Sequence, residues 1–320
     1  VPRYFMARKG GKPMNGNCST TGCKNPERLP DADRLAYQWK SIDWKKAEAE
    51  VNRLQARIAK ATQEKKWNTV KRLQYLLTHS YHAKALAVRK VTTNKGKNTP
   101  GIDRELWSTP ASKMRGVLTL TDKGYKAKPL RRVFIEKKGK KAKRPLGIPC
   151  MYDRAMQALY ALALDPVSET TADGKSFGFR KGRCAQDACE YIFTALSRKV
   201  SPQWVLEGDI KGCFDHISHD WLIEHIPMDK SVLKQFLKAG FIFQDELFPT
   251  DEGTPQGGVI SPILANMTLD GMQKALSDRF HTNRQGKVSL QYKNAHKVNL
   301  VRYADDFIVT AATRELAEEA

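Results

Sequence analysis

Two adjacent aspartates, Asp305 and Asp306, lie within the sequence VNLVRYADDFIVTA at residues 298–311. The apolar segments at 298–303 and 307–309 flank a short Ala-Asp-Asp break, a pattern typical of a β-hairpin with the two carboxylates at its tip. Aspartates at a turn are often only solvated. A second source of carboxylates is therefore needed before the pair indicates chemistry.

A third aspartate stands at the end of another predicted strand. In VLEGDIKGCFDHISH, residues 205–219, Val205 and Leu206 lead to Asp209, and Ser218 can cap the helix that follows. Carboxylates at a strand end and on a neighbouring hairpin would present hard oxygen ligands, which Mg²⁺ prefers while it keeps other positions for water and substrate phosphates. Two such ions could activate a hydroxyl nucleophile and stabilise a leaving pyrophosphate.

The Tyr-Ala-Asp-Asp sequence at residues 303–306 resembles the active-site hairpin of group II intron reverse transcriptases, and Asp209 matches the first metal-binding aspartate of that family. The resemblance implies nucleotidyl transfer with two Mg²⁺ ions. It implies that Asp209, Asp305 and Asp306 are the catalytic residues and metal ligands, together with the backbone carbonyl of Ile210. An enzyme with this metal pair needs no neutral general base beside the nucleophile.

The resemblance also implies a deoxynucleotide site close to these carboxylates. Phe214 falls five residues after Asp209, where the family has an aromatic steric gate. A ring at that position would clash with a ribose 2′-hydroxyl and so select deoxynucleotides. Tyr303, next to the aspartate pair, would also contact the nucleotide.

Three further segments match the family in its order: RRVFIEKKGKKAKRPLGIP at 131–149, SFGFRKGRCAQDA at 176–188 and GTPQGGVISPILANMTLDGM at 253–272. The first resembles the fingers hairpin, which implies that Lys137, or its neighbour Lys138, and Arg144 contact the triphosphate. The last resembles the block that packs on the incoming nucleotide, which implies that Gln256 lies near the base and sugar. Each segment alone could be an ordinary turn or loop, but five ordered blocks favour the family.

The net charge of +21 on this 320-residue chain is concentrated in one region. Residues 51–150 hold 26 Lys and Arg against 5 Asp and Glu, whereas residues 1–50 hold 10 against 6 and residues 151–320 hold 19 against 23. A block this basic would repel itself without a polyanion. Nucleic acid is favoured over an anionic membrane, because no bulky apolar face lies opposite the charges.

The basic region is predicted to be helical. Apolar side chains recur at intervals of three and four over 47–61 and over 67–77, so each segment would form a helix with one apolar stripe. Ser41 or Asp43 can cap the first helix. The polar faces of both helices would contact RNA phosphates, and the candidate side chains are Arg53, Arg57, Lys60, Lys71 and Arg72.

Downstream of this region the residue pattern predicts a mixture of strands and helices. It predicts a helix from 151 to 164 that stops at Pro166, a basic turn at 139–143, and strands at 130–135, 144–148, 204–209 and 300–303. This mixture without regular βαβ alternation predicts an α+β fold. The resemblance implies the fingers and palm of a right-hand polymerase, with an antiparallel palm sheet.

We expect four parts along the chain. They are a flexible tail at 1–30, a basic helical extension at 31–100, fingers at 101–195, and an incomplete palm at 196–320. The thumb and later domains of the family are expected to be absent from this chain.

Other features exclude competing classes of protein. No apolar run approaches the roughly eighteen residues of a membrane span, and the first residues lack a signal-peptide pattern, which favours an intracellular, cytoplasmic protein. Cys18 and Cys23 have no second ligand pair at zinc spacing. His216, His219 and His225 are expected to be exposed imidazoles beside a capped helix rather than metal ligands.

These features together predict an RNA-directed DNA polymerase that uses an RNA template, a DNA primer and deoxynucleoside triphosphates. It would also bind its intron RNA as a maturase for splicing and retrohoming. One alternative is a non-intron reverse transcriptase of the retron, diversity-generating or CRISPR-associated type. Another is an RNA-binding splicing cofactor that does not polymerise, although the intact Asp209, Asp305 and Asp306 argue against it.

Overall fold

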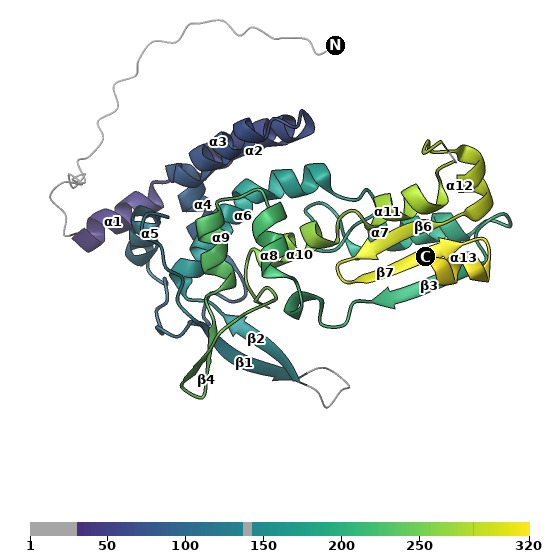
Figure 1. Ribbon diagram of the computed structural model, residues 1–320. Coiled ribbons are helices and arrows are strands. Elements are labelled where there is room, and N and C mark those ends of the chain that lie inside the picture. Colours follow the sequence, from purple (N-terminus) through teal and green to yellow (C-terminus); the bar gives the residue numbers. More distant parts are fainter. Residues whose placement is uncertain (1–30, 137–142, 256, 284) are drawn as a thin grey trace, which may run out of the picture.

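The computed structural model describes residues 31–136, 143–255, 257–283 and 285–320. A helical lobe carries a small sheet beneath it, and a second lobe is built on another sheet (Figure 1). Several predictions lie outside the described residues: the tail at 1–30, most of the basic turn at 139–143, Lys137, Lys138, Gln256, Cys18 and Cys23.

The helical lobe is built around α6 (Met151–Thr171), which is buried on most of its circumference as expected of a central helix. Helices α2, α3 and α4 pack directly against it, and α1 packs against α5. The bounds of these helices are α1 (Asp31–Lys40), α2 (Trp44–Gln63), α3 (Trp67–His79), α4 (Tyr81–Thr93) and α5 (Pro110–Thr119).

The predicted apolar stripe of α2 is confirmed. Val51, Ile58 and Ala61 are buried against the helical core. The helix begins after Asp43, whose carboxylate accepts a hydrogen bond from the amide of Lys46 at 3.0 Å. Of the two predicted caps, Asp43 is therefore the one used, because its side chain satisfies an amide that has no partner inside the helix.

The stripe of α3 is confirmed only in its centre. Val70, Leu73 and Leu77 are buried, whereas Trp67 and Leu76 are 44% and 53% exposed. Both exposed residues lie at the edges of the stripe, where the helix surface turns away from its neighbours.

Helix α6 continues through Pro166, so the prediction that it stops there was wrong. Proline has no amide hydrogen, and the carbonyl of Leu162 therefore loses its helical partner. Nε2 of Gln55 on α2 donates to this carbonyl at 2.7 Å, and Nε2 of Gln74 on α3 donates to the carbonyl of Ala163 at 3.3 Å. Two neighbouring helices thus supply the hydrogen bonds that allow the helix to pass the proline.

The sheet beneath the helices begins with the predicted hairpin of β1 (Leu130–Glu136) and β2 (Lys143–Ile148). Two short strands that the pattern did not predict, β4 (Phe241–Phe243) and β5 (Glu246–Phe248), extend it in the order β2-β1-β4-β5. Strand β4 runs parallel to β1. The pairing joins two segments that are far apart in the sequence.

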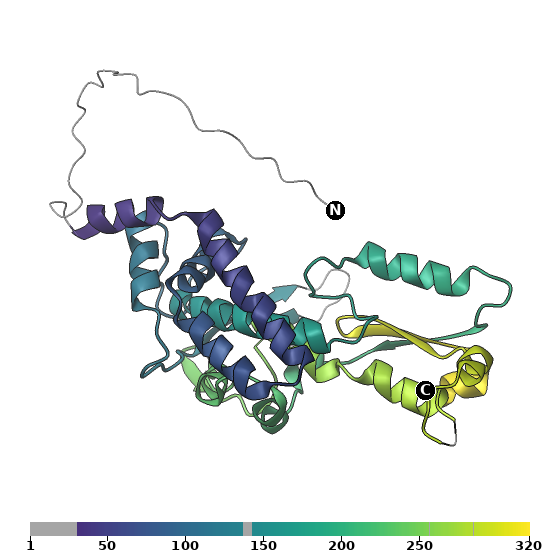
Figure 2. The same cartoon turned by 90° about the horizontal axis from the view of Figure 1, so that it is seen from above.

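The second sheet consists of β3 (Trp204–Asp209), β6 (Asn299–Tyr303) and β7 (Asp306–Ala311), all antiparallel, in the order β3-β7-β6. Figure 2 shows α7 (Ala185–Leu196) on one side of this sheet and α11 (Met272–Phe280) on the other. Adjacent side chains of β6 point to opposite faces of the sheet, so Leu300 packs in the cluster with Phe280 and Val301 packs in the cluster with Ala188.

Short elements complete the two lobes. They are the 3₁₀ turn η2 (Cys213–Asp215), α8 (His219–His225), α9 (Lys230–Leu237), α10 (Ser261–Leu269), α12 (Leu290–His296) and α13 (Arg314–Glu319). The separate helices and largely antiparallel sheets confirm the predicted α+β class. Within the described ranges, no helix is long and apolar enough to cross a membrane.

Candidate active site

The three predicted carboxylates meet at one end of the β3-β7-β6 sheet. Strands β6 and β7 form the predicted hairpin, with Tyr303 paired to Asp306 and with Ala304 and Asp305 in the turn. Asp209, the last residue of β3, lies directly opposite Asp306 on β7. Ala304 has a φ of +60°, the left-handed conformation that such a tight turn requires. The sheet register thus brings together residues separated by nearly a hundred positions.

Backbone hydrogen bonds tie the hairpin to the segment after β3. The amide of Ile210 donates to the carbonyl of Asp305 at 3.3 Å. The carbonyl of Ile210, a predicted metal ligand, accepts from the amide of Cys213 at 3.1 Å. A carbonyl oxygen has two lone pairs, so this bond leaves one acceptor position on Ile210.

The carboxylates repel one another. The pKa of Asp306 is raised by partial burial and, next, by the negative charges of Asp305, Asp209 and Glu207. In the described part of the chain, no three His, Cys, Asp or Glu side chains lie close enough together to hold a metal ion by themselves. The donors at this sheet end are all hard oxygens under mutual repulsion, and such a set fits Mg²⁺.

The segment at 175–178 holds the hairpin from the side of β6. The amide of Phe177 donates to the carbonyl of Arg302, and the amide of Arg302 donates to the carbonyl of Lys175, both at 2.9 Å. Gly178 lies so close to the turn that a Cβ atom there would come within 2.3 Å of the amide nitrogen of Ala304. Only glycine permits this approach, which explains its place in the predicted block at 176–188.

A buried network of charges lies directly behind the hairpin. Nη2 of Arg302 donates to Asp270 at 2.7 Å, and its Nη1 donates to the carbonyl of Ala304 at 3.1 Å. Nη2 of Arg180 lies 2.7 and 2.8 Å from the two carboxylate oxygens of the same aspartate. Asn266 on α10 accepts from Arg302 and donates to the carbonyl of Gly178. This network connects three of the predicted blocks.

Sequence reasoning did not single out Arg302, Asp270 or Arg180. The signal that could have found them is Arg302, which lies at a position of β6 that the alternation of side chains along the strand assigns to the core. A fully buried arginine requires an acidic partner.

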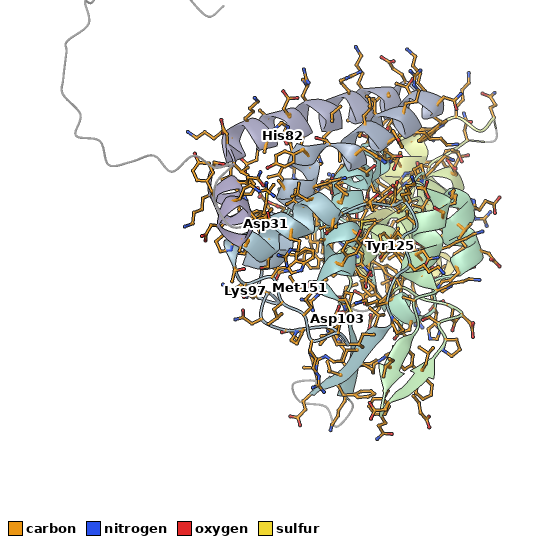
Figure 3. The ribbon with its side chains drawn as sticks, turned by 90° about the vertical axis from the view of Figure 1, so that its left-hand side faces the viewer. Asp31, His82, Lys97, Asp103, Tyr125 and Met151 are labelled. Atoms are coloured by element: carbon orange, nitrogen blue, oxygen red, sulfur yellow. The ribbon has the colours of Figure 1, made fainter. Side chains whose placement is uncertain are left out.

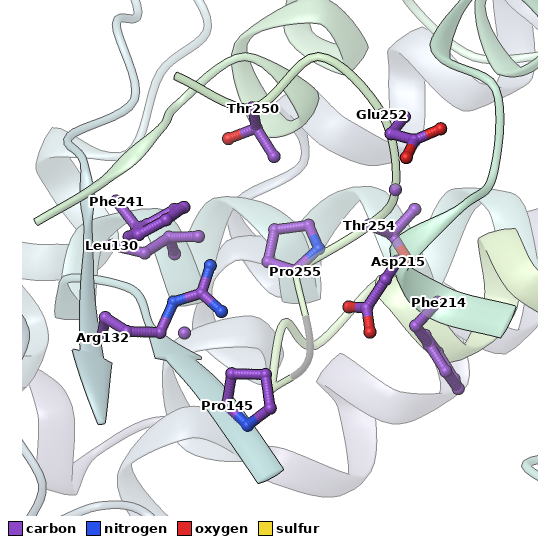
Figure 4. Close-up of a pocket in the computed structure, with 12 residues that line it drawn as sticks. Leu130, Arg132, Pro145, Phe214, Asp215, Phe241, Thr250, Glu252, Thr254 and Pro255 are labelled. Carbon is purple, nitrogen blue, oxygen red and sulfur yellow. The ribbon is translucent and has the colours of Figure 1, made fainter. Parts of the chain in front are cut away.

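A cavity of about 260 Å³ lies between the sheet that carries β1 and β2, the turn η2 with Phe214, and the segment at 250–255. In Figure 4, Arg132 points from β1 into this cavity, and Asp215 points toward it from the opposite wall. The amide of Thr254 donates to the carbonyl of Phe214 at 2.7 Å, so the segment from the predicted 253–272 block is fixed against η2. Phe214 is half-buried and belongs to the lining of this cavity, whose volume admits part of a ligand.

The other predicted nucleotide contacts lie at the edges of this region. Tyr303 is exposed at the end of β6, beside the carboxylates. Arg144 is exposed on β2, opposite Ile135 in the hairpin register.

The three histidines differ in their surroundings. His216 lies 3.0 Å from Glu252, and the ring of His225 stacks on Trp221, both near the surface. The prediction of an exposed imidazole was wrong for His219, which is buried and donates from Nε2 to the carbonyl of Gly253 at 2.7 Å. It is thus a structural link between α8 and the 253–258 loop.

The predicted RNA-binding side chains are all exposed on α2 and α3. Figure 3, which views the helical lobe from its outer side, shows many long side chains standing away from these helices. One of them is already paired, since Nη2 of Arg53 lies 2.6 Å from Glu50. Exposed pairs of this kind are weak, so this arginine remains available to a phosphate.

Comparison with known protein families defines the class of this chain. Residues 39–120 match the N-terminal domain of reverse transcriptase, and residues 135–320 match the reverse transcriptase (RNA-dependent DNA polymerase) family. The second match covers more than half of the chain. The chain therefore belongs to the reverse transcriptase family.

Its relatives include proteins encoded by introns. The group II intron-encoded protein LtrA of Lactococcus lactis subsp. cremoris is 34% identical over 253 residues, which are 75% of this chain and 41% of LtrA. The putative COX1/OXI3 intron 1 protein of Saccharomyces cerevisiae is 30% identical, with 67% of this chain and 26% of that protein covered. The predicted resemblance to the group II intron type is confirmed at this level, and the chain spans about two fifths of LtrA.

Protein YkfC of Escherichia coli (strain K12) is also 30% identical, with 70% of this chain and 66% of YkfC covered. Among solved structures, a Cas6-RT-Cas1–Cas2 complex matches 76% of this chain and 24% of its own chain, at 24% identity and a TM-score of 0.43. A structural likeness of that level supports no inference about assembly or partners.

Proposed function

We propose that this chain is the fingers and palm portion of an RNA-directed DNA polymerase, which extends a DNA primer on an RNA template. The observation that carries the proposal is the sheet register that sets Asp209 opposite Asp306, with Asp305 in the adjoining turn. Carboxylates on a rigid sheet suit a reaction in which catalysis consists mainly of positioning and charge stabilisation. Membership of the reverse transcriptase family supports the same conclusion.

Two Mg²⁺ ions, when bound, would activate the primer 3′-hydroxyl and stabilise the leaving pyrophosphate. In this proposal Asp209, Asp305 and Asp306 hold the ions, and the carbonyl of Ile210 adds a backbone ligand. The raised pKa of Asp306 supports the assignment, because a carboxylate among like charges gains most from a bound cation. The hydrogen bond from the amide of Ile210 to the carbonyl of Asp305 would keep β3 and the hairpin at a fixed separation while their carboxylates hold the ions.

The proposed deoxynucleotide site lies next to the carboxylates. Phe214 would act as the gate against a 2′-hydroxyl, and Tyr303 would contact the nucleotide beside it. Arg144 would bind the triphosphate, because a guanidinium pairs well with phosphate oxygens. Lys137 and Gln256, which lie outside the described residues, are proposed to bind the triphosphate and the base on the strength of the sequence resemblance alone.

We also propose that the basic helices bind intron RNA, as required of a maturase in splicing and retrohoming. Intron-encoded relatives support this branch over retron, diversity-generating and CRISPR-associated enzymes. In this proposal residues 31–100 form the RNA-binding extension, residues 101–195 the fingers and residues 196–320 the palm. The candidate phosphate contacts are Arg53, Arg57, Lys60, Lys71 and Arg72.

Primer extension on an RNA template with Mg²⁺ and deoxynucleotides tests the polymerase. Asp305→Ala should abolish DNA synthesis while template binding stays nearly unchanged, because binding rests on distant phosphate contacts. Asp278→Ala is the matched control, since that aspartate is exposed on α11 and should retain full activity. Substantial synthesis by Asp305→Ala would refute the assignment. A wild-type chain that binds RNA but makes no product would favour the alternative, a splicing cofactor.

A further inference from the structure

A second cavity, of about 300 Å³, opens between α3, α6 and the start of α9. It shares no lining residue with the cavity beside Phe214, and the catalytic proposal makes no use of it. Its buried lining combines the apolar residues Ala163 and Met228 with the polar side chains of Gln74 and Thr78. Because α3 also carries two of the proposed phosphate contacts, a polyanion bound to this helix would pass the mouth of the cavity.

One wall of this cavity is an aromatic ring that faces solvent. Tyr75 is 61% exposed, yet its ring stacks on His79 with centroids 3.9 Å apart and an interplanar angle of 27°. The ring of His79 fixes the orientation of Tyr75 and leaves it available for stacking with another planar group.

The cavity also carries carboxylate oxygens with remaining acceptor capacity. Oδ2 of Asp122 accepts from the hydroxyl of Tyr160 at 3.2 Å, and Nε2 of His79 lies 3.4 Å from Oδ1. Each carboxylate oxygen accepts more than one hydrogen bond, so both atoms have room for a further donor. Asp229 makes its bonds to the amide and hydroxyl of Ser231 through Oδ1, which leaves Oδ2 for a ligand.

Two lysines complete the lining. Lys71 belongs to α3 and Lys230 to α9. The pKa of Lys230 is lowered by burial and then by the positive charge of Lys71. A phosphate between the two ammonium groups would remove this repulsion. A stacking face, acceptors for amino groups and a paired cationic rim therefore surround one space.

We propose that this cavity binds a single unstacked base of the RNA that lies on the basic helices. The base would stack on Tyr75 and donate its amino group to Asp122 or Asp229, while its phosphate lies at Lys71 and Lys230. Splayed bases held on aromatic side chains are a common mode of RNA recognition. The inference rests on the proposed RNA binding and adds a base preference to it.

The carboxylates define that preference. Guanine, adenine and cytosine present amino donors, whereas both exocyclic groups of uracil are carbonyls that a carboxylate repels. A guanine presents adjacent donors and matches a carboxylate best. The cavity should therefore favour guanosine over uridine, although the phosphate contacts alone would not distinguish them.

Fluorescence anisotropy with two labelled probes tests the proposal on the full chain at one fixed salt concentration. One probe is a short oligouridine, and the other is the same oligonucleotide with one central guanosine. The wild type should bind the guanosine probe about tenfold more tightly. Tyr75→Ala and the double variant of Asp122→Asn with Asp229→Asn should each remove most of this preference. Tyr75→Phe should retain it, and Tyr37→Ala, which removes an exposed tyrosine of α1 outside the cavity, should have no effect.

Equal affinity of the wild type for the two probes would overturn the proposal, as would a Tyr75→Ala variant that keeps the full preference. Circular dichroism of each variant shows whether the helices are intact. Tyr75→Phe removes only the hydroxyl and keeps the ring, so it shows whether stacking on the ring is sufficient for the preference. Primer extension by the same preparations separates the two hypotheses. Normal extension without base preference refutes only the cavity, whereas absent extension by the wild type refutes the polymerase.

Discussion

The guanidinium of Arg302 lies 2.7 Å from the carboxylate of Asp270, immediately behind the turn that carries Asp305. The same guanidinium donates to the carbonyl of Ala304, so the position of the turn depends on a buried ion pair. The pair links the end of α10 to β6. The protein thus holds its acidic turn against mutual repulsion by fixing the backbone from behind.

Asp270→Asn should destabilise the fold by about 3 kcal/mol, because it leaves the buried charges of Arg302 and Arg180 without their shared carboxylate. Urea unfolding measures the change. Arg34→Gln is the comparison, since Arg34 pairs with Asp31 on the exposed surface of α1 at 2.7 Å and should cost less than about 1 kcal/mol. Equal losses in the two variants would contradict the buried-network interpretation.

Phe214→Val should admit ribonucleotides, because a smaller side chain leaves room for the 2′-hydroxyl. Discrimination between deoxynucleotides and ribonucleotides should fall by roughly ten- to a hundredfold, with deoxynucleotide incorporation less affected. Single-nucleotide primer extension with each nucleotide type gives the ratio. Phe193→Val on α7, where the ring is exposed and does not line this cavity, should leave the ratio unchanged. An unaltered ratio in Phe214→Val would place the gate on another residue.

Much of the fold could be predicted because its signals are local. The stripe of α2, the β1-β2 hairpin and the turn at Asp305 each follow from residues within one element. The convergence of Asp209 with this turn was accessible through the family resemblance, since nothing in the intervening residues specifies the strand order.

Other features depend on partners that are distant in the chain. Helix α6 continues past Pro166 because Gln55 and Gln74 reach its carbonyls from two other helices. Strand β4 is three residues long and is held between β5 and the distant strand β1, where it pairs with Leu130 and Arg131. Its length gives no periodic signal. His219 was expected to be exposed because the spacing of the three histidines suits a capped helix with exposed imidazoles. Its burial results from a loop that arrives from residue 253.

Stability should depend on pH through Asp153. Burial raises the pKa of this carboxyl to about 6 from an ordinary value of 3.8, although Tyr125 donates to it at 2.8 Å. Because the folded state favours the protonated form, the stability contribution is fully present below pH 3.8 and is lost as the pH rises through about 6.

The stability of the wild type relative to Asp153→Asn, which does not titrate at this position, should therefore fall by up to about 3 kcal/mol between pH 4 and pH 7. Urea unfolding of both proteins at a series of pH values measures this difference, in which the contributions of the other titrating groups cancel. Asp278→Asn, at an exposed site on α11, should show no such trend. A difference independent of pH would mean that folding does not raise the pKa of Asp153.

The salt dependence of RNA binding should reveal whether the basic helices contact phosphates. Each phosphate neutralised by Lys or Arg releases condensed counterion, so log affinity falls with log salt by roughly 0.7 to 0.9 per contact. Reversal of Arg53, Arg57, Lys60 and Lys71 to Glu should flatten that slope by several units. The apolar stripes of α2 and α3 are untouched, so the fold should persist.

Titration of a labelled structured RNA at several salt concentrations gives the slope for the wild type and the reversed variant. The proposed catalytic carboxylates lie in the other lobe, so at low salt and saturating template the variant should still extend a primer. A matched variant that reverses Lys234, Lys274 and Lys293, exposed lysines of α9, α11 and α12, should change the slope much less. If instead the α2 and α3 variant keeps both wild-type affinity and slope, these helices are a scaffold, and intron RNA must bind through another surface.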